Sequence, residues 1–362
     1  MEGSPTDIVI FAPLAPLLGV LLFWFIQLLF IESEKFLLSK VRPKHEPLCR
    51  FTNFLGILFQ SICHALGYTV TKSGISDFYI SVNYGRVAPK REKKGIFEWI
   101  ANAFLFIGPF FIPAGMLLLC LFLTPVSFDI ITPPQLISVK YTFAGQIMTF
   151  GASLHNFGEG FFGFLFNLDL LHPGHLGYLF LLIFLGMGIR PSYIGEKQQR
   201  KVDMLYDLKN IWNLITHKPL YILLLFLMAY LFFYVNLILN EIWKINYNLY
   251  AGFFSMLGWL SIISIVAIII ADAILYLIKT ADKIPGFWKF IPYLTIPLSY
   301  VLIRLALLPF KTEYTNFLSL LVMAVSTILV TYLIHGFKTN KFKTKRAIKK
   351  SKKKDKDDND EE

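Results

Sequence analysis

The residues of this chain best placed to do chemistry are Gln60, Ser61 and His64, which lie in one apolar segment. On a helix, residues four positions apart share one face, so positions 60 and 64 could together hold a zinc ion. A hydrolytic zinc site of this spacing has histidine at both positions and a glutamate after the first, which is the general base for zinc-bound water. Here a neutral glutamine and a serine hydroxyl stand in those places, and neither replaces the missing group near neutral pH. His64 alone is not expected to hold a catalytic zinc.

Asp169, His172 and His175 form a second group of possible metal ligands, because carboxylate and imidazole are both common zinc ligands. The same residues also fit a turn at the membrane surface built around Pro173 and Gly174. The three cysteines, at positions 49, 63 and 120, form no closely spaced pair and indicate neither a disulfide framework nor a cysteine zinc site. No cofactor is therefore expected, and zinc only if replacement ligands complete a site.

Two ionisable residues, Asp272 and Arg304, lie inside long apolar segments, where a charge is costly and is a functional candidate. Asp272 stands seven residues before Lys279, about 10 Å from the inner boundary at 1.5 Å per residue. Arg304 stands seven residues before Lys311, near the outer boundary. Because these depths differ, we expect no direct pair between them. Arg304 is expected to extend to the outer interface, and Asp272 to face the bundle or an inner cavity, where it could serve transport.

The composition predicts the class of protein that must position these side chains. The chain is 55% hydrophobic and only 16% charged, and it contains 36 phenylalanines. Several apolar runs of about 20 residues each match the hydrocarbon thickness of a bilayer, roughly 30 Å. A soluble helical protein is excluded, because its helices would show one apolar stripe, whereas Ile222–Leu239 is apolar almost all round. We therefore expect an all-α polytopic membrane protein.

About eight transmembrane helices are predicted, because backbone groups in lipid must be paired within their own segment. They cover approximately residues 8–31, 51–70, 96–124, 176–190, 219–239, 250–278, 289–308 and 315–336. A small β-hairpin insert is expected after the second span, where Asp77–Tyr84 alternates like a strand and Gly85 allows a turn or bulge.

The distribution of Lys and Arg predicts the orientation. With the N-terminus inside, the inner connections and the tail carry 26 of these residues and the outer connections carry 8. This bias places the C-terminus in the cytoplasm. The first outer connection, with five basic residues, argues against the orientation of the first span only.

Three stretches resemble the site-2 protease family of intramembrane metalloproteases. Phe59–Gly67 lies where that family has a zinc-binding HExxH helix, Val82–Val87 resembles its glycine-containing strand, and Trp99–Pro109 resembles the start of its next helix. The resemblance covers about residues 50–215, whereas 219–336 has no counterpart. It implies a membrane core with a degenerate, non-catalytic motif. The family's remaining ligand would come from the helix 175–190, whose Gly186–Arg190 end carries no ligand side chain.

The same resemblance implies a role for the hairpin. In active members such a hairpin is thought to hold substrate as an added strand, so Tyr79, Val82, Tyr84 and Gly85 are the candidate substrate-binding residues. The alternative is a hairpin that only covers the helices.

The predicted division of the chain is 1–50, an N-terminal span and loop; 51–215, the site-2 protease-like core; 216–336, a four-helix extension; and 337–362, a tail. The tail carries eleven Lys or Arg between Lys338 and Lys356 and ends in acidic residues, which predicts disorder and attraction to anionic lipids. No aromatic platform or motif indicates specific nucleic-acid binding.

Three functions remain open at this stage. The leading one is a proteolytically inactive membrane protein that binds or chaperones membrane segments of other proteins. The second is a zinc-dependent intramembrane protease with replacement ligands, and the third is a small-solute transporter that uses Asp272. Expected partners are the lipid bilayer, anionic lipids at the tail, and other membrane proteins.

Overall fold

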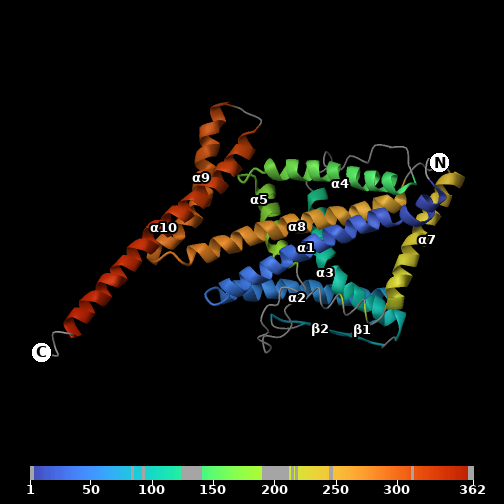
Figure 1. Ribbon diagram of the computed structural model, residues 1–362, viewed down its shortest axis with the longest axis horizontal. Coiled ribbons are helices and arrows are strands. Elements are labelled where there is room, and N and C mark those ends of the chain that lie inside the picture. Colours follow the sequence, from blue (N-terminus) through green and yellow to red (C-terminus); the bar gives the residue numbers. More distant parts are fainter. Residues whose placement is uncertain are drawn as a thin grey trace. The chain divides into compact units, whose positions relative to one another are not determined.

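The computed structural model describes residues 4–82, 85–91, 94–123, 141–189, 212, 216, 219–243, 248–310 and 314–357. The chain folds as helices with one small two-stranded sheet, which confirms the predicted all-α membrane class and its β-hairpin (Figure 1). The elements in chain order are η1 (Asp7–Phe11), α1 (Leu14–Val41), α2 (Glu46–Val70), β1 (Ile75–Ile80), β2 (Gly85–Pro89), α3 (Ile96–Phe122), α4 (Phe143–Phe166), α5 (Pro173–Gly186), α7 (Pro219–Trp243), α8 (Leu249–Ala281), η3 (Gly286–Phe290), α9 (Ile291–Leu307), η4 (Leu308–Phe310) and α10 (Thr315–Asp357).

Within the described residues, five helices are long and apolar enough to cross a membrane. These are Asp7–Val41, Leu223–Trp243, Leu249–Ala281, Gly286–Leu307 and Thr315–Phe337. Two shorter apolar stretches are the Phe110–Phe122 part of α3 and the helix α5, Pro173–Gly186. The helix α2, which is also expected to span, is continuous, but the polar residues Asn53, Gln60 and His64 interrupt its apolar sequence. The protein is therefore a multi-pass membrane protein, with five of its predicted spans meeting both criteria in the part of the chain described.

Two helices are longer than the sequence predicts. α1 continues to Val41 through residues expected to form an outer loop, because Lys35 and Glu32 are both buried and form an ion pair at 2.9 Å. α10 continues to Asp357 through the basic segment that was expected to be disordered. Lysine is a good helix former and is favoured near a helix C-terminus, and the preceding apolar turns already supply the helix nucleus.

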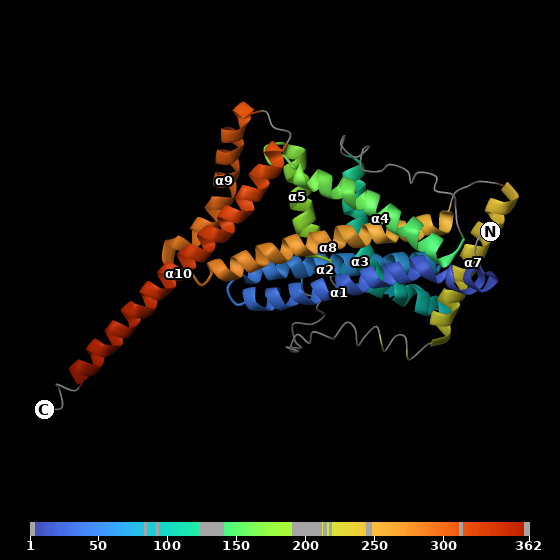
Figure 2. The same cartoon turned by 45° about the horizontal axis from the view of Figure 1, so that its top comes forward.

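The chain forms two compact units. The first contains Met1–Phe164 and Leu170–Asp272, and the second contains Leu165–Asp169 and Ala273–Glu362. This division differs from the predicted boundary at residue 215, because α7 and most of α8 belong to the same unit as α1 to α5. In the first unit, α1 runs beside α2 and the hairpin lies along α2 (Figures 1 and 2). In the second, α9 and α10 pack as an antiparallel pair.

Tyrosine hydroxyls attach α7 and α8 to the N-terminal helix. Pro13 has no N–H to donate to the carbonyl of Val9, four residues earlier, and the local π-helical pairing leaves further carbonyls without their usual partners. Tyr234 donates to the Val9 carbonyl, Tyr230 to the Ile10 carbonyl, and Tyr250 to the Pro13 carbonyl. In lipid an unpaired carbonyl costs several kcal/mol, so these bonds explain why segments about 220 residues apart pack together.

A second polar junction joins α4, α7 and α8. The buried side chain of Asn248 donates to Gln146 at 2.9 Å and accepts from Asn236 at 3.2 Å. The side-chain oxygen of Asn248 also accepts a hydrogen bond from the backbone N–H of Ala251 at 2.9 Å, so this side chain caps the first turn of α8. Each of these buried amides is hydrogen-bonded, as a buried polar group requires.

A third junction lies at the proline-containing part of α3. Pro113 disturbs the helical ladder there, and the carbonyl of Phe110 accepts bonds from Gln27 of α1 at 3.2 Å and from Ser264 of α8 at 3.0 Å. Nearby, α3 approaches α2 at Gly108, where a Cβ atom would stand 2.5 Å from the sulfur of Cys63. These contacts place the face of α2 that carries Cys63 against α3.

The close approach of α3 to α2 predicts opposite effects for two glycine substitutions in one helix. Gly108→Ala should lower the Tm of the detergent-purified protein, because overpacking costs about 1–3 kcal/mol. Gly115→Ala is the matched control: nothing lies within 4 Å of its added Cβ, and alanine is the better helix former. Cys63→Ala should restore part of the stability lost in Gly108→Ala. A Gly108→Ala protein as stable as Gly115→Ala would contradict this packing.

Candidate functional site

The segment Gln60–His64 lies in the last third of α2, with its side chains in different surroundings. Ser61 is buried at 4% exposure and Cys63 at 0%, whereas Gln60 and His64 are half-buried. The His64 ring stacks loosely on Tyr68 one turn later, at 5.4 Å between centroids. The Nδ1 atom of His64 is buried and has no hydrogen-bond partner among the described residues. Ser61 is therefore more enclosed than Gln60 or His64.

The β-hairpin covers Ser61. A Cβ atom on Gly85, at the start of β2, would stand 2.5 Å from the Ser61 hydroxyl oxygen and 2.8 Å from a methyl carbon of Ile57. At the turn, the side-chain amide of Asn53 donates to the Val82 carbonyl at 3.0 Å. Asn53, Ile57 and Ser61 are spaced by four residues, so one face of α2 carries all three contacts. The hairpin is thus held against α2 at Ser61 by a hydrogen bond and by close backbone packing.

The register of the hairpin assigns its side chains to two faces. Ile80 pairs with Gly85 and Tyr79 pairs with Arg86. Since side chains alternate along a strand, Ile80 shares the face that Gly85 turns to α2, and Tyr79 and Arg86 lie on the opposite face. Among the predicted substrate-binding residues, Tyr79 is 47% exposed and Val82 is 42% exposed, and Gly85 packs on α2. Tyr84 lies outside the described residues.

The end of α5 also meets α2. A Cβ atom on Gly188, just after α5, would stand 2.7 Å from the ring of Phe59 and 3.0 Å from Leu55. Gly186 contacts α8 in the same way, with its added Cβ 2.6 Å from the carbonyl oxygen of Ala267. Glycine is needed at both positions because backbone or ring atoms fill the space of a side chain. This helix end therefore brings main chain, and no ligand side chain, to the neighbourhood of Phe59.

The second predicted metal group is divided between the two units. The rings of His172 and His175 lie 4.7 Å apart at the start of α5, in the first unit. Asp169 belongs to the second unit, where it is engaged by other residues. A search of the described residues finds no cluster of three His, Cys, Asp or Glu side chains that could hold a metal.

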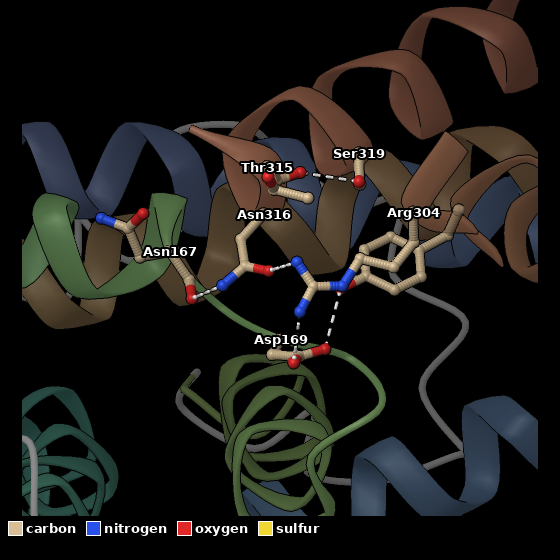
Figure 3. Close-up of polar contacts among 7 residues, drawn as sticks. Asn167, Asp169, Arg304, Thr315, Asn316 and Ser319 are labelled. Atoms are coloured by element: carbon tan, nitrogen blue, oxygen red, sulfur yellow. Dashed lines mark hydrogen bonds and ion pairs between the residues drawn. The ribbon is translucent and has the colours of Figure 1, made fainter. Parts of the chain in front are cut away.

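Asp169 and Arg304 form the ion pair that the sequence analysis missed (Figure 3). Arg304 donates to one carboxylate oxygen of Asp169 at 2.9 Å, and the Tyr300 hydroxyl donates to the other at 3.2 Å. Arg304 also donates to the side chain of Asn316, which in turn donates to the Asn167 carbonyl at 3.1 Å. The prediction that Arg304 extends to the outer interface stays a prediction; the structure adds that the carboxylate of Asp169 pairs with its charge. The sequence predicts Arg304 near the outer boundary, but no pattern in it pairs that residue with Asp169.

Asp272 lies on α8 and is half-buried. A side-chain hydrogen bond links it to Ser33 of α1, and its Oδ1 atom is buried without a partner. The expectation that Asp272 faces the helices of the bundle agrees with this contact. Its proposed part in transport stays a prediction.

Comparisons of the chain with protein-family models, with curated proteins and with solved structures find no match. The resemblance to site-2 proteases therefore stays a prediction from the residues that carry it.

The contact between Gly85 and Ser61 predicts that even a methyl group will loosen the hairpin. In Gly85→Ala, backbone amides of residues 75–89 should exchange with deuterium faster than in the unmodified protein, because β2 must move off α2. Ser61→Ala removes the nearest atom, so the double variant should recover part of the protection. Ser61→Ala alone is the control. Unchanged exchange in Gly85→Ala would refute the close packing.

The network around Arg304 predicts a coupled loss of stability. Arg304→Gln and Asp169→Asn should each lower the Tm, by an amount corresponding to about 1–2 kcal/mol for a hydrogen bond to a charged group. Arg304→Lys should rescue little, because one ammonium cannot engage Asp169 and Asn316 as the planar guanidinium does. The double variant should lose less than the sum of the two single losses. Strict additivity would mean that the pair does not contribute as a unit.

Proposed function

We propose that this protein is a proteolytically inactive membrane protein with a site-2 protease-like core, and that its hairpin binds extended membrane segments of other proteins. The observation that carries the proposal is the covered Ser61: the position of the general base is buried, and the backbone of β2 occupies the space beside it. A zinc-bound water and its base need open volume between the helix and a substrate strand. The contact between Gly85 and Ser61 therefore supports a protein that holds a peptide but does not cleave it.

The hairpin offers two features that suit a peptide-binding role. The described sheet has only two strands, and each strand of such a sheet has an outer edge with N–H and C=O groups directed away from its partner. An extended segment can pair with an edge of this kind, while side chains of the carrier contact alternate residues of the guest. Tyr79 and Val82 are exposed and apolar, as contacts to a membrane-derived segment require. Asn53 and Gly85 hold the strands on α2, so the edge is fixed before a guest arrives.

Photo-crosslinking of the full-length protein in its native membrane tests the binding role. A benzophenone side chain replacing Tyr79 should form adducts with apolar segments of other membrane proteins, identified by mass spectrometry. Tyr332, which is 78% exposed on α10, is the matched position for the control, because contact with lipid alone would label both. Adducts at position 79 that do not exceed those at position 332 would argue against the hairpin as a binding surface.

Metal analysis of the purified protein tests the inactive state separately. We expect less than stoichiometric zinc and no cleavage of a crosslinked guest, with no change on His64→Ala. One zinc per chain that disappears in His64→Ala, together with cleavage, would replace this proposal by the protease alternative.

A further inference from the structure

Four exposed basic side chains gather at the base of the hairpin, between the end of α2 and the start of α3. They are Lys72, Lys90, Arg91 and Lys94. Two backbone bonds place the end of β2 beside the residues that precede β1: the Lys90 N–H donates to the Gly74 carbonyl at 3.1 Å and the Arg91 N–H to the Ser73 carbonyl at 3.0 Å. Lys72 is therefore a near neighbour of Lys90 and Arg91, although 18 residues separate it from Lys90 in the sequence.

Among the residues that the structure describes, no carboxylate pairs with this basic cluster. The acidic residue of the strands, Asp77, forms an ion pair with Arg86 at 3.3 Å, outside the cluster. Within the part of the chain described, none of the four basic residues forms an ion pair. Four like charges that repel one another and face outward favour an anionic partner.

Exposed apolar side chains flank the cluster on both helices. Leu66 and Val70, in the last turns of α2, are 43% and 60% exposed, and Phe97, in the first turn of α3, is 48% exposed. Basic groups at the ends of two apolar helices, with apolar side chains directly beside them, match the two parts of a phospholipid. The phosphate would contact the lysines and the arginine, and the acyl chains would contact Leu66, Val70 and Phe97.

We propose that the hairpin base is a binding site for an anionic phospholipid of the leaflet at which α2 ends and α3 begins. The positive-inside bias predicts that this leaflet is cytoplasmic, which is the leaflet enriched in anionic lipid. The site is separate from the turn that contacts Asn53, and it does not depend on the proposed peptide-binding role. It would fix the hairpin at the depth of the headgroups.

Native mass spectrometry of the full-length protein in detergent tests this site, with phosphatidylglycerol as the probe and phosphatidylcholine as the neutral comparison. A variant in which Lys72, Lys90, Arg91 and Lys94 are all glutamine should bind phosphatidylglycerol at least about tenfold more weakly, since each near-surface charge contributes about fivefold. Its affinity for phosphatidylcholine and its Tm should not change, because the four side chains are exposed and pair with no carboxylate among the described residues.

The matched control removes the same number of charges from the C-terminal segment, as Lys349, Lys350, Lys352 and Lys353 to glutamine. The proposal expects this control to keep its high-affinity phosphatidylglycerol site. Equal losses in both variants, or no loss in the hairpin variant, would overturn it. Displacement of the lipid by glycerol phosphate at the same concentration would also overturn it, because the flanking apolar side chains would then have no part in binding.

Discussion

Backbone polar groups inside a membrane must be paired, and the contacts between distant parts of this chain follow from that requirement. Prolines near the N-terminus and in α3 interrupt the helical ladder in segments that are otherwise apolar. Near each of these prolines a side chain from another helix donates to a main-chain carbonyl: tyrosines of α7 and α8 near the first, Gln27 and Ser264 near the second. The proline-containing segments are thus places where distant helices pack together.

Small residues have a complementary part, because they decide how near the helices can come. Gly108 against Cys63, Gly186 against the backbone of Ala267, and Gly188 against Phe59 bring α3 and the end of α5 close to α2 and α8. In lipid the hydrophobic effect does not drive helices together, so close packing of this kind and hydrogen bonds are the main sources of association. The degenerate motif lies where both kinds of contact meet on α2.

The helices and the hairpin were predictable from the sequence, because apolar runs of membrane length and a period-two strand pattern are local signals. Their ends were less predictable. The charges in residues 32–41 and in the segment after 337 predict an end to each helix, whereas Glu32 pairs with Lys35 on α1 itself and α10 continues to Asp357. The pair between Asp169 and Arg304 joins residues 135 positions apart, and no pattern in one sequence reports such a distance. The contact of Gly85 with Ser61 was missed for the same reason, although both residues had been singled out.

The contact of Gly85 with Ser61 bears on both the hydrolytic chemistry and the position of the hairpin. Ser61 stands where the resemblance to metalloproteases would require glutamate, and its oxygen already lies within 2.5 Å of a Cβ position on Gly85. A longer side chain at position 61 would meet β2, and a carboxylate buried there would also lose its hydration. A general base and a hairpin at this distance therefore exclude each other. The small side chain permits the hairpin to rest on α2, and the hairpin in turn closes the position to hydrolytic chemistry. In the function proposed above, this one close contact would account both for the absence of hydrolytic chemistry at position 61 and for a hairpin edge held ready for a peptide.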